Sequence, residues 1–138
     1  MTLMPINPIQ PVYRKIKGKW TEVNPLSGVD AQVTLMLGIR HTIGRASYSP
    51  GCAIDFARAA WAWLEPNSRY VVVRDVIEWL VDERWDKHRA YKDGWTAFAL
   101  DRLRVEGDDF ARRCVKSAMW MPDSRTSENA QPFKGWME

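Results

Sequence analysis

The sequence predicts a mainly α-helical protein, a small bundle of about five helices preceded by an extended N-terminal arm. Three observations lead to this prediction. Apolar residues recur at helical spacing from residue 29 to residue 118. Four of the eight prolines fall within the first 26 residues, where they disfavour a helix. A chain of 138 residues that is 46% hydrophobic suits one core. We therefore expect an extended basic arm at 1–26, a helical domain at 27–121 and a polar C-terminal tail at 122–138.

The arm combines positive charge with loosely alternating apolar residues. Val12, Ile16 and Trp20 share one parity of alternation, but Arg14 and Glu22 share it too. The pattern therefore predicts no more than one short β-hairpin or edge strand. Toward the other end of the chain, the polar tail contains two aromatic residues, at 133 and 136, and we expect it to be loose and to dock through them.

Helices are expected at about 29–43, 51–64, 68–80, 93–104 and 108–118. Gly44 is a natural end for the first helix, and an N-cap at Asn67 or Ser68 would open the third. The β-branched run at the start of the third helix suits a strand equally well, so both alternatives remain open for residues 68–77. The charged segment 82–89 is expected to be solvent-exposed.

The positive charge of the chain is concentrated near its N-terminus. The formal net charge is +3, and residues 1–50 hold six Lys and Arg against two acidic residues. A segment of this kind can meet phosphates or an acidic protein, and the alternative is a solvated strand without a partner. No apolar run is long enough to span a bilayer and no leader pattern precedes the arm, so we expect a cytoplasmic protein without a membrane partner. Cys52 and Cys114 are expected to be reduced, buried thiols.

The familiar catalytic motifs are absent from the sequence. It has no Gly-rich phosphate loop, no HExxH, no paired CxxC and no GxSxG. A zinc site would need both histidines and both cysteines to meet from four separate elements, which the lack of local ligand pairs disfavours. We therefore expect a protein that is not an enzyme and has no metal and no cofactor.

One polar constellation stands out, at residues 40–48 between the first two helices. Arg40 suits a helix C-terminus, but capping does not explain Arg45 and Tyr48. Together with Arg74 in the third helix, these residues form a candidate site for an anion such as a phosphate. In the structural alternative, Arg45 pairs with Asp75 and Tyr48 is a core aromatic.

The same stretch resembles a group of small phage and prophage accessory proteins. In that group a helix ends in an Ala-Leu-Gly-Arg-x-Thr-Tyr box, and Ile43-Gly44-Arg45-Ala46-Ser47-Tyr48 is similar to it here. The third helix also begins near an Arg-Asp-Ile, matched by Arg74-Asp75-Val76. The resemblance covers residues 35–77, about a third of the chain. It implies a small helical fold and a viral accessory role in the bacterial cytoplasm, of the counter-defence or anti-CRISPR kind.

These observations suggest three functions, in order of preference. The first is a non-enzymatic inhibitor that binds a host defence protein or ribonucleoprotein complex. Its candidate partner-binding residues are Arg14, Lys15, Lys17, Lys19, Trp20, Trp85 and Arg89. The second is a module that sequesters an anionic ligand, such as a signalling nucleotide, at Arg40, Arg45, Tyr48 and Arg74. The third is nucleic-acid binding through the arm. The sequence leaves the oligomeric state open, a homodimer included.

Overall fold

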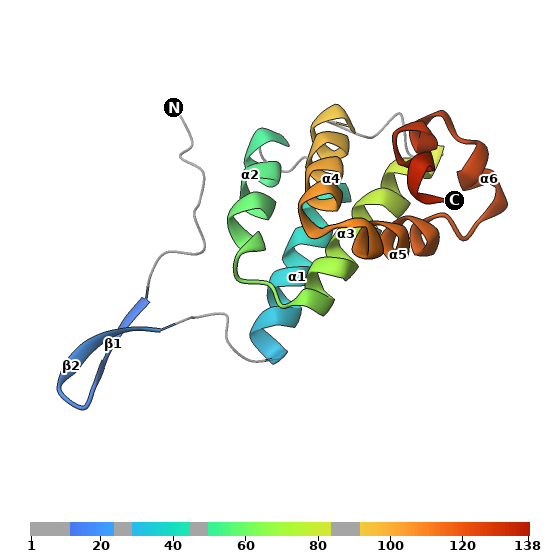
Figure 1. The fold of residues 1–138 in the computed structure, drawn as a ribbon. Coiled ribbons are helices and arrows are strands. Elements are labelled where there is room, and N and C mark those ends of the chain that lie inside the picture. The colour runs from blue at the N-terminus through green and yellow to red at the C-terminus, as the bar shows by residue number, and fades with distance from the viewer. Residues whose placement is uncertain (1–11, 24–28, 45–49, 84–91) are drawn as a thin grey trace.

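The computed structural model describes residues 12–23, 29–44, 50–83 and 92–138 of the chain. These residues form a two-stranded hairpin followed by a packed helical body, so the predicted mainly α-helical fold with a short hairpin is confirmed (Figure 1). The strands are β1 (Val12–Ile16) and β2 (Lys19–Val23). The helices are α1 (Val29–Gly44), α2 (Pro50–Trp61), α3 (Pro66–Val81), α4 (Lys92–Glu106), α5 (Asp108–Ala118), α6 (Pro122–Thr126) and the 3-10 helix η2 (Glu128–Trp136).

Helix α3 is the centre of the body. It packs against α1, α4, α5 and η2, and its buried face runs from Val72 to Val81. Val72, Val73, Val76 and Ile77 are completely buried. Burial on several sides explains why β-branched residues that suit a strand are helical here, because tertiary packing outweighs their modest helix propensity. The alternative of a strand at 68–77 is thereby settled in favour of a helix.

The start of α3 differs from the prediction. Pro66 is at the first helical turn and Glu65 is the N-cap, so neither Asn67 nor Ser68 has that role. Proline suits this position because the missing N–H has no partner within the helix there. The helix therefore begins three residues earlier than a cap at Ser68 would place it. No helix in the described parts of the chain is long and apolar enough to cross a membrane.

Helices α2 and α4 meet through aromatic side chains. Phe98 contacts Trp61 and Trp95 edge-to-face, with ring centroids 6.1 Å and 5.6 Å apart. A buried glutamine joins α1 to the turn after α2. The Gln32 amide donates to the Trp63 carbonyl, and its oxygen accepts from the Glu65 N–H. These contacts fix three helices around the start of α3.

The C-terminal segment is not the loose tail that its polar composition predicts. Phe133 and Ala130 are completely buried, and η2 packs on α3 and α5. Asn129 donates to the Leu80 carbonyl at 2.9 Å, which satisfies a backbone acceptor in the last turn of α3. The Glu83 carboxylate accepts from the Ser127 hydroxyl and the Glu128 N–H. Periodicity missed this segment because its contacts join it to the distant end of α3.

The hairpin differs from the body in having no core of its own. Its strands pair in antiparallel register, with Ile16 opposite Lys19 and Lys15 opposite Trp20. Lys17 and Gly18 form the turn with positive φ values of 52° and 80°, the conformation that two-residue hairpin turns favour. This turn pairs residues of opposite parity. Trp20 therefore shares a face with Lys15 and not with Ile16, contrary to what the shared parity of Ile16 and Trp20 indicates.

Candidate functional site

The first candidate site is the tip of the hairpin, defined here as residues 15–21. Every residue of the tip is exposed, and Trp20 has a relative solvent exposure of 73%. Lys15, Lys17 and Lys19 surround it in sequence and belong to the same exposed stretch. In Figure 1 the hairpin projects away from the helices. The structure thus gathers four of the predicted partner-binding residues on one projecting surface.

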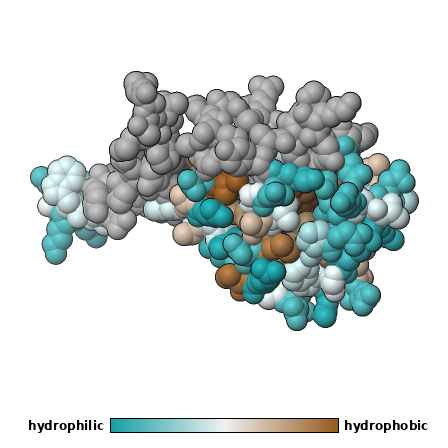
Figure 2. Space-filling model, turned by 90° about the horizontal axis from the view of Figure 1, so that it is seen from above, coloured by the Kyte–Doolittle hydropathy of each residue, from teal (hydrophilic) through white to brown (hydrophobic). Residues whose placement is uncertain are grey.

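The charge of the chain is divided unequally between hairpin and body. The hairpin, residues 12–23, holds four of the 20 Lys and Arg and one of the 17 acidic residues, which leaves 16 of each for the rest of the chain. The hairpin therefore contains the whole net charge of +3. In Figure 2 the described surface of the body is mainly hydrophilic, with hydrophobic side chains scattered among polar ones.

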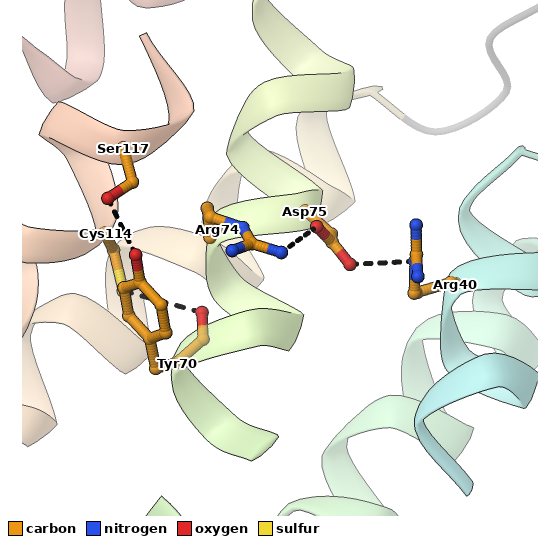
Figure 3. A network of polar contacts seen from close by, with 6 residues as sticks. All are labelled: Arg40, Tyr70, Arg74, Asp75, Cys114 and Ser117. Carbon is orange, nitrogen blue, oxygen red and sulfur yellow. Dashed lines mark hydrogen bonds and ion pairs between the residues drawn. The ribbon is translucent and has the colours of Figure 1, made fainter. Parts of the chain in front are cut away.

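The second candidate site is a row of polar side chains that crosses α3 (Figure 3). Asp75, whose side chain is 13% exposed, contacts two guanidinium groups. Arg40 Nε of α1 lies 2.8 Å from Asp75 Oδ2, and Arg74 Nη2 donates to Asp75 Oδ1 at 3.2 Å. Burial lowers the pKa of Arg74, but the hydrogen bond and charge of Asp75 raise it by more, so its pKa lies above the ordinary value. Two guanidinium groups thus contact one carboxylate in this row.

The row continues from Arg74 to α5 through the ring of Tyr70. The guanidinium carbons of Arg74 and Arg113 lie 5.5 Å and 3.9 Å from the centre of this ring, distances at which a cation is attracted to the π system. The Tyr70 hydroxyl donates to Ser117 Oγ at 2.7 Å, and the Cys114 thiol donates to the Tyr70 carbonyl. Tyr70 thus fixes two arginines and one hydroxyl at the junction of α3 and α5.

Cys114 belongs to this junction but is not a reactive thiol. It is completely buried and free, as the sequence predicts for it. Burial raises the pKa of its thiol to about 12, although the charges of Arg113 and Arg74 oppose the shift. Because the thiolate is the nucleophilic form, Cys114 is protonated and inert at neutral pH.

A second pair of arginines has a structural role at the other side of α3. The guanidinium carbons of Arg69 and Arg102 lie 5.4 Å and 5.3 Å from the centre of the Trp61 ring. Arg69 also donates to the Trp61 carbonyl and lies 3.5 Å from Glu106. Trp61 is only 6% exposed, so this pair covers the edge of the core.

The structure brings together only part of the predicted anion site. Arg40 and Arg74 converge on Asp75, whereas Arg45 and Tyr48 lie outside the described residues. The predicted alternative for Arg45, an ion pair with Asp75, therefore remains a prediction, although Arg40 and Arg74 already contact both oxygens of that carboxylate.

The remaining partner-binding predictions stay predictions. Trp85 and Arg89 also lie outside the described residues, and Arg14 belongs to β1 but its side chain is not described. Among the described residues, no group of three His, Cys, Asp or Glu side chains is placed to hold a metal ion.

Sequence reasoning missed three residues of the row. Tyr70 lies four residues before Arg74, and Arg113 lies four residues before Ser117, so each pair shares one helix face. This spacing in the sequence indicates which residues share a helix face. That the two faces meet depends on how α3 packs against α5, which no local pattern encodes.

Comparison of the chain with protein-family models, with curated proteins and with solved structures returned no match. The resemblance to phage accessory proteins stays a prediction, and the candidate sites stand on their own geometry.

Proposed function

We propose that this protein acts by binding and not by catalysis, and that the hairpin tip engages an acidic surface of another protein. The observation on which this proposal rests is the exposure of Trp20 at 73% in a stretch where all of residues 15–21 face solvent. Tryptophan is strongly enriched among the residues that dominate binding energy at protein interfaces. Covering Trp20 would remove a large apolar area from water.

An isolated two-stranded hairpin is at best marginally stable in water. The tip contributes no residue to the buried core, so the body gains nothing from the exposed tryptophan and lysines there. A partner that covers Trp20 would both stabilise the hairpin and bury its apolar ring.

The charge distribution favours an acidic protein as the partner. The positive charge on the hairpin would accelerate the encounter with an acidic surface and orient the complex. A nucleic acid is less favoured, because the body has equal numbers of basic and acidic residues and so offers no excess charge to follow a phosphate backbone.

The resemblance to phage accessory proteins suggests a purpose for such binding. A viral protein that occupies a host defence protein or ribonucleoprotein complex blocks it stoichiometrically and needs no catalytic group. We propose this inhibitory role for the chain, with the hairpin as the contacting element and the helical body as its scaffold.

The test is capture of partners from a nuclease-treated bacterial lysate by three immobilised proteins. These are the wild type, the hairpin variant Lys15→Glu/Lys17→Glu/Lys19→Glu, and a body variant Arg112→Glu/Lys116→Glu/Lys134→Glu. All six side chains are exposed, so the two variants differ in where the charge is reversed and not in how much.

We expect the wild type and the body variant to retain the same protein, and the hairpin variant to lose it. Capture should weaken as salt rises from about 50 mM to about 200 mM. Equal capture by all three proteins would refute the role of the hairpin. Capture that disappears with nuclease treatment would replace the protein partner with a nucleic acid.

A further inference from the structure

The junction of α3 and α5 has more arginine side chains than carboxylates that pair with them. Arg40 and Arg74 contact Asp75, the carboxylate of the row (Figure 3). Arg74 and Arg113 both lie against the Tyr70 ring. Nearby Glu106 is paired with Arg69 instead. Within the described residues, no carboxylate lies within ion-pair distance of Arg113.

The donors at this junction are held in place before any ligand arrives. Arg113 is exposed and its guanidinium lies 3.9 Å from the centre of the Tyr70 ring. Arg74 is 32% exposed and is held by Tyr70 on one side and Asp75 on the other. Its Nε is buried and has no hydrogen-bond partner among the described residues. An arginine held this way loses little side-chain entropy when it binds an anion.

Ser117 adds a neutral donor beside the two arginines. Its oxygen accepts the Tyr70 hydroxyl proton, so its own proton is free to point outward. Two guanidinium groups and a hydroxyl suit an oxyanion with several oxygens, because each planar guanidinium can donate two parallel hydrogen bonds to it.

We infer that Arg74, Arg113 and Ser117 form a binding site for a phosphate-bearing ligand on the surface between α3 and α5. Arg40 supports the site through its ion pair with the second oxygen of Asp75, at 2.8 Å. The site is separate from the hairpin, so it adds a second ligand to the proposed function and does not depend on it.

The test is titration with inorganic pyrophosphate, followed by calorimetry and by the shift in melting temperature, against sodium chloride of equal ionic strength. The variant Arg113→Gln removes the exposed guanidinium. The matched control Arg112→Gln removes the same charge one residue away on α5, from a residue that is also exposed.

We expect Arg113→Gln to raise the dissociation constant for pyrophosphate at least about tenfold, and Arg112→Gln to leave it within about twofold. Arg113→Gln also removes the cation–π contact with Tyr70, so the unliganded variant should melt slightly below the wild type, and each pyrophosphate-induced shift is measured from the variant's own unliganded melting temperature. The conservative Arg113→Lys keeps the charge but not the planar donors, and should restore only part of the affinity. Equal weakening in Arg113→Gln and Arg112→Gln, or no effect of pyrophosphate beyond that of sodium chloride, would overturn the site. The hairpin variant should bind pyrophosphate as the wild type does, which separates this result from the proposed function.

Discussion

The hairpin and the helical body use the same kinds of residue in opposite ways. In the body, arginines lie against the buried Trp61 and the half-buried Tyr70 or pair with Asp75 and Glu106. In the hairpin, lysines and Trp20 are exposed together. Aromatic rings and carboxylates fix the arginines of the body at contacts between helices, whereas the lysines and the tryptophan of the hairpin tip are exposed to solvent. The following experiments test this difference between the hairpin and the body.

The largest effect should come from the C-terminal segment of the body. Phe133→Ala removes a completely buried ring and should lower the free energy of unfolding by about 3–5 kcal/mol, measured by urea denaturation. The control Trp120→Ala truncates a larger aromatic that is 63% exposed, and should change stability by less than about 1 kcal/mol. If both variants unfold at the wild-type midpoint, the segment is not part of the core.

A smaller loss of stability is expected at the bridge between α1 and the start of α3. Gln32→Ala leaves the Trp63 carbonyl and the Glu65 N–H without their partner, which should cost about 1–3 kcal/mol in the free energy of unfolding. The exposed Gln131 provides a matched control, because Gln131→Ala removes the same amide from the surface. Equal unfolding midpoints for the two variants would contradict the bridge.

The next effect is a dependence on pH at the end of α3. Hydrogen bonds from the Ser127 hydroxyl and the Glu128 N–H lower the pKa of Glu83 from its ordinary value of 4.5. A carboxyl whose pKa is lowered by folding stabilises the folded state above the unfolded pKa, and this contribution is lost as the pH falls through the folded pKa. The protection factors of the η2 amides, which correct for the slower intrinsic exchange in acid, should therefore fall below about pH 4.5.

Glu83→Gln removes the titrating group but keeps an oxygen that accepts hydrogen bonds. The protection factors in η2 should then fall in acid no more than those in α4 do. A steep acid loss of protection in η2 that persists unchanged in Glu83→Gln would assign the effect to another carboxyl group.

The smallest effect on the body should come from the hairpin turn. Lys17 has a positive φ, which asparagine adopts more readily, so Lys17→Asn should increase the protection of hairpin amides from exchange. Gly18→Val should reduce that protection, because a β-branched residue is strained at a φ of 80°. Neither change should move the unfolding midpoint of the body beyond about 0.5 kcal/mol. A larger shift would show that the hairpin contributes to the core.

Helices α1 to α5 could be predicted from the sequence because their apolar residues recur at helical spacing. The pattern from Val72 to Leu80 is an example, although only packing decided between helix and strand there. The faces of the hairpin could not be predicted by parity, because the two-residue turn at Lys17 and Gly18 determines which residues pair.

The site was harder to predict than the fold. Arg40 was singled out by its place near a helix C-terminus and Arg74 by the resemblance at Arg74-Asp75-Val76. Arg113 and Ser117 were not, because their meeting with Tyr70 depends on the contact between α3 and α5. The packed C-terminal segment was missed for the same reason. Glu83 and Leu80 hold it from more than forty residues away.

The claim that the hairpin tip is the contact surface is tested most directly by hydroxyl-radical footprinting, with mass spectrometry, of the protein alone and bound to its captured partner. Trp20 and Trp120 offer a matched pair, at 73% and 63% exposure on the hairpin and on the body. We predict that oxidation of Trp20 falls several-fold on binding while oxidation of Trp120 stays the same. Undiminished oxidation of Trp20 in the complex would contradict the account.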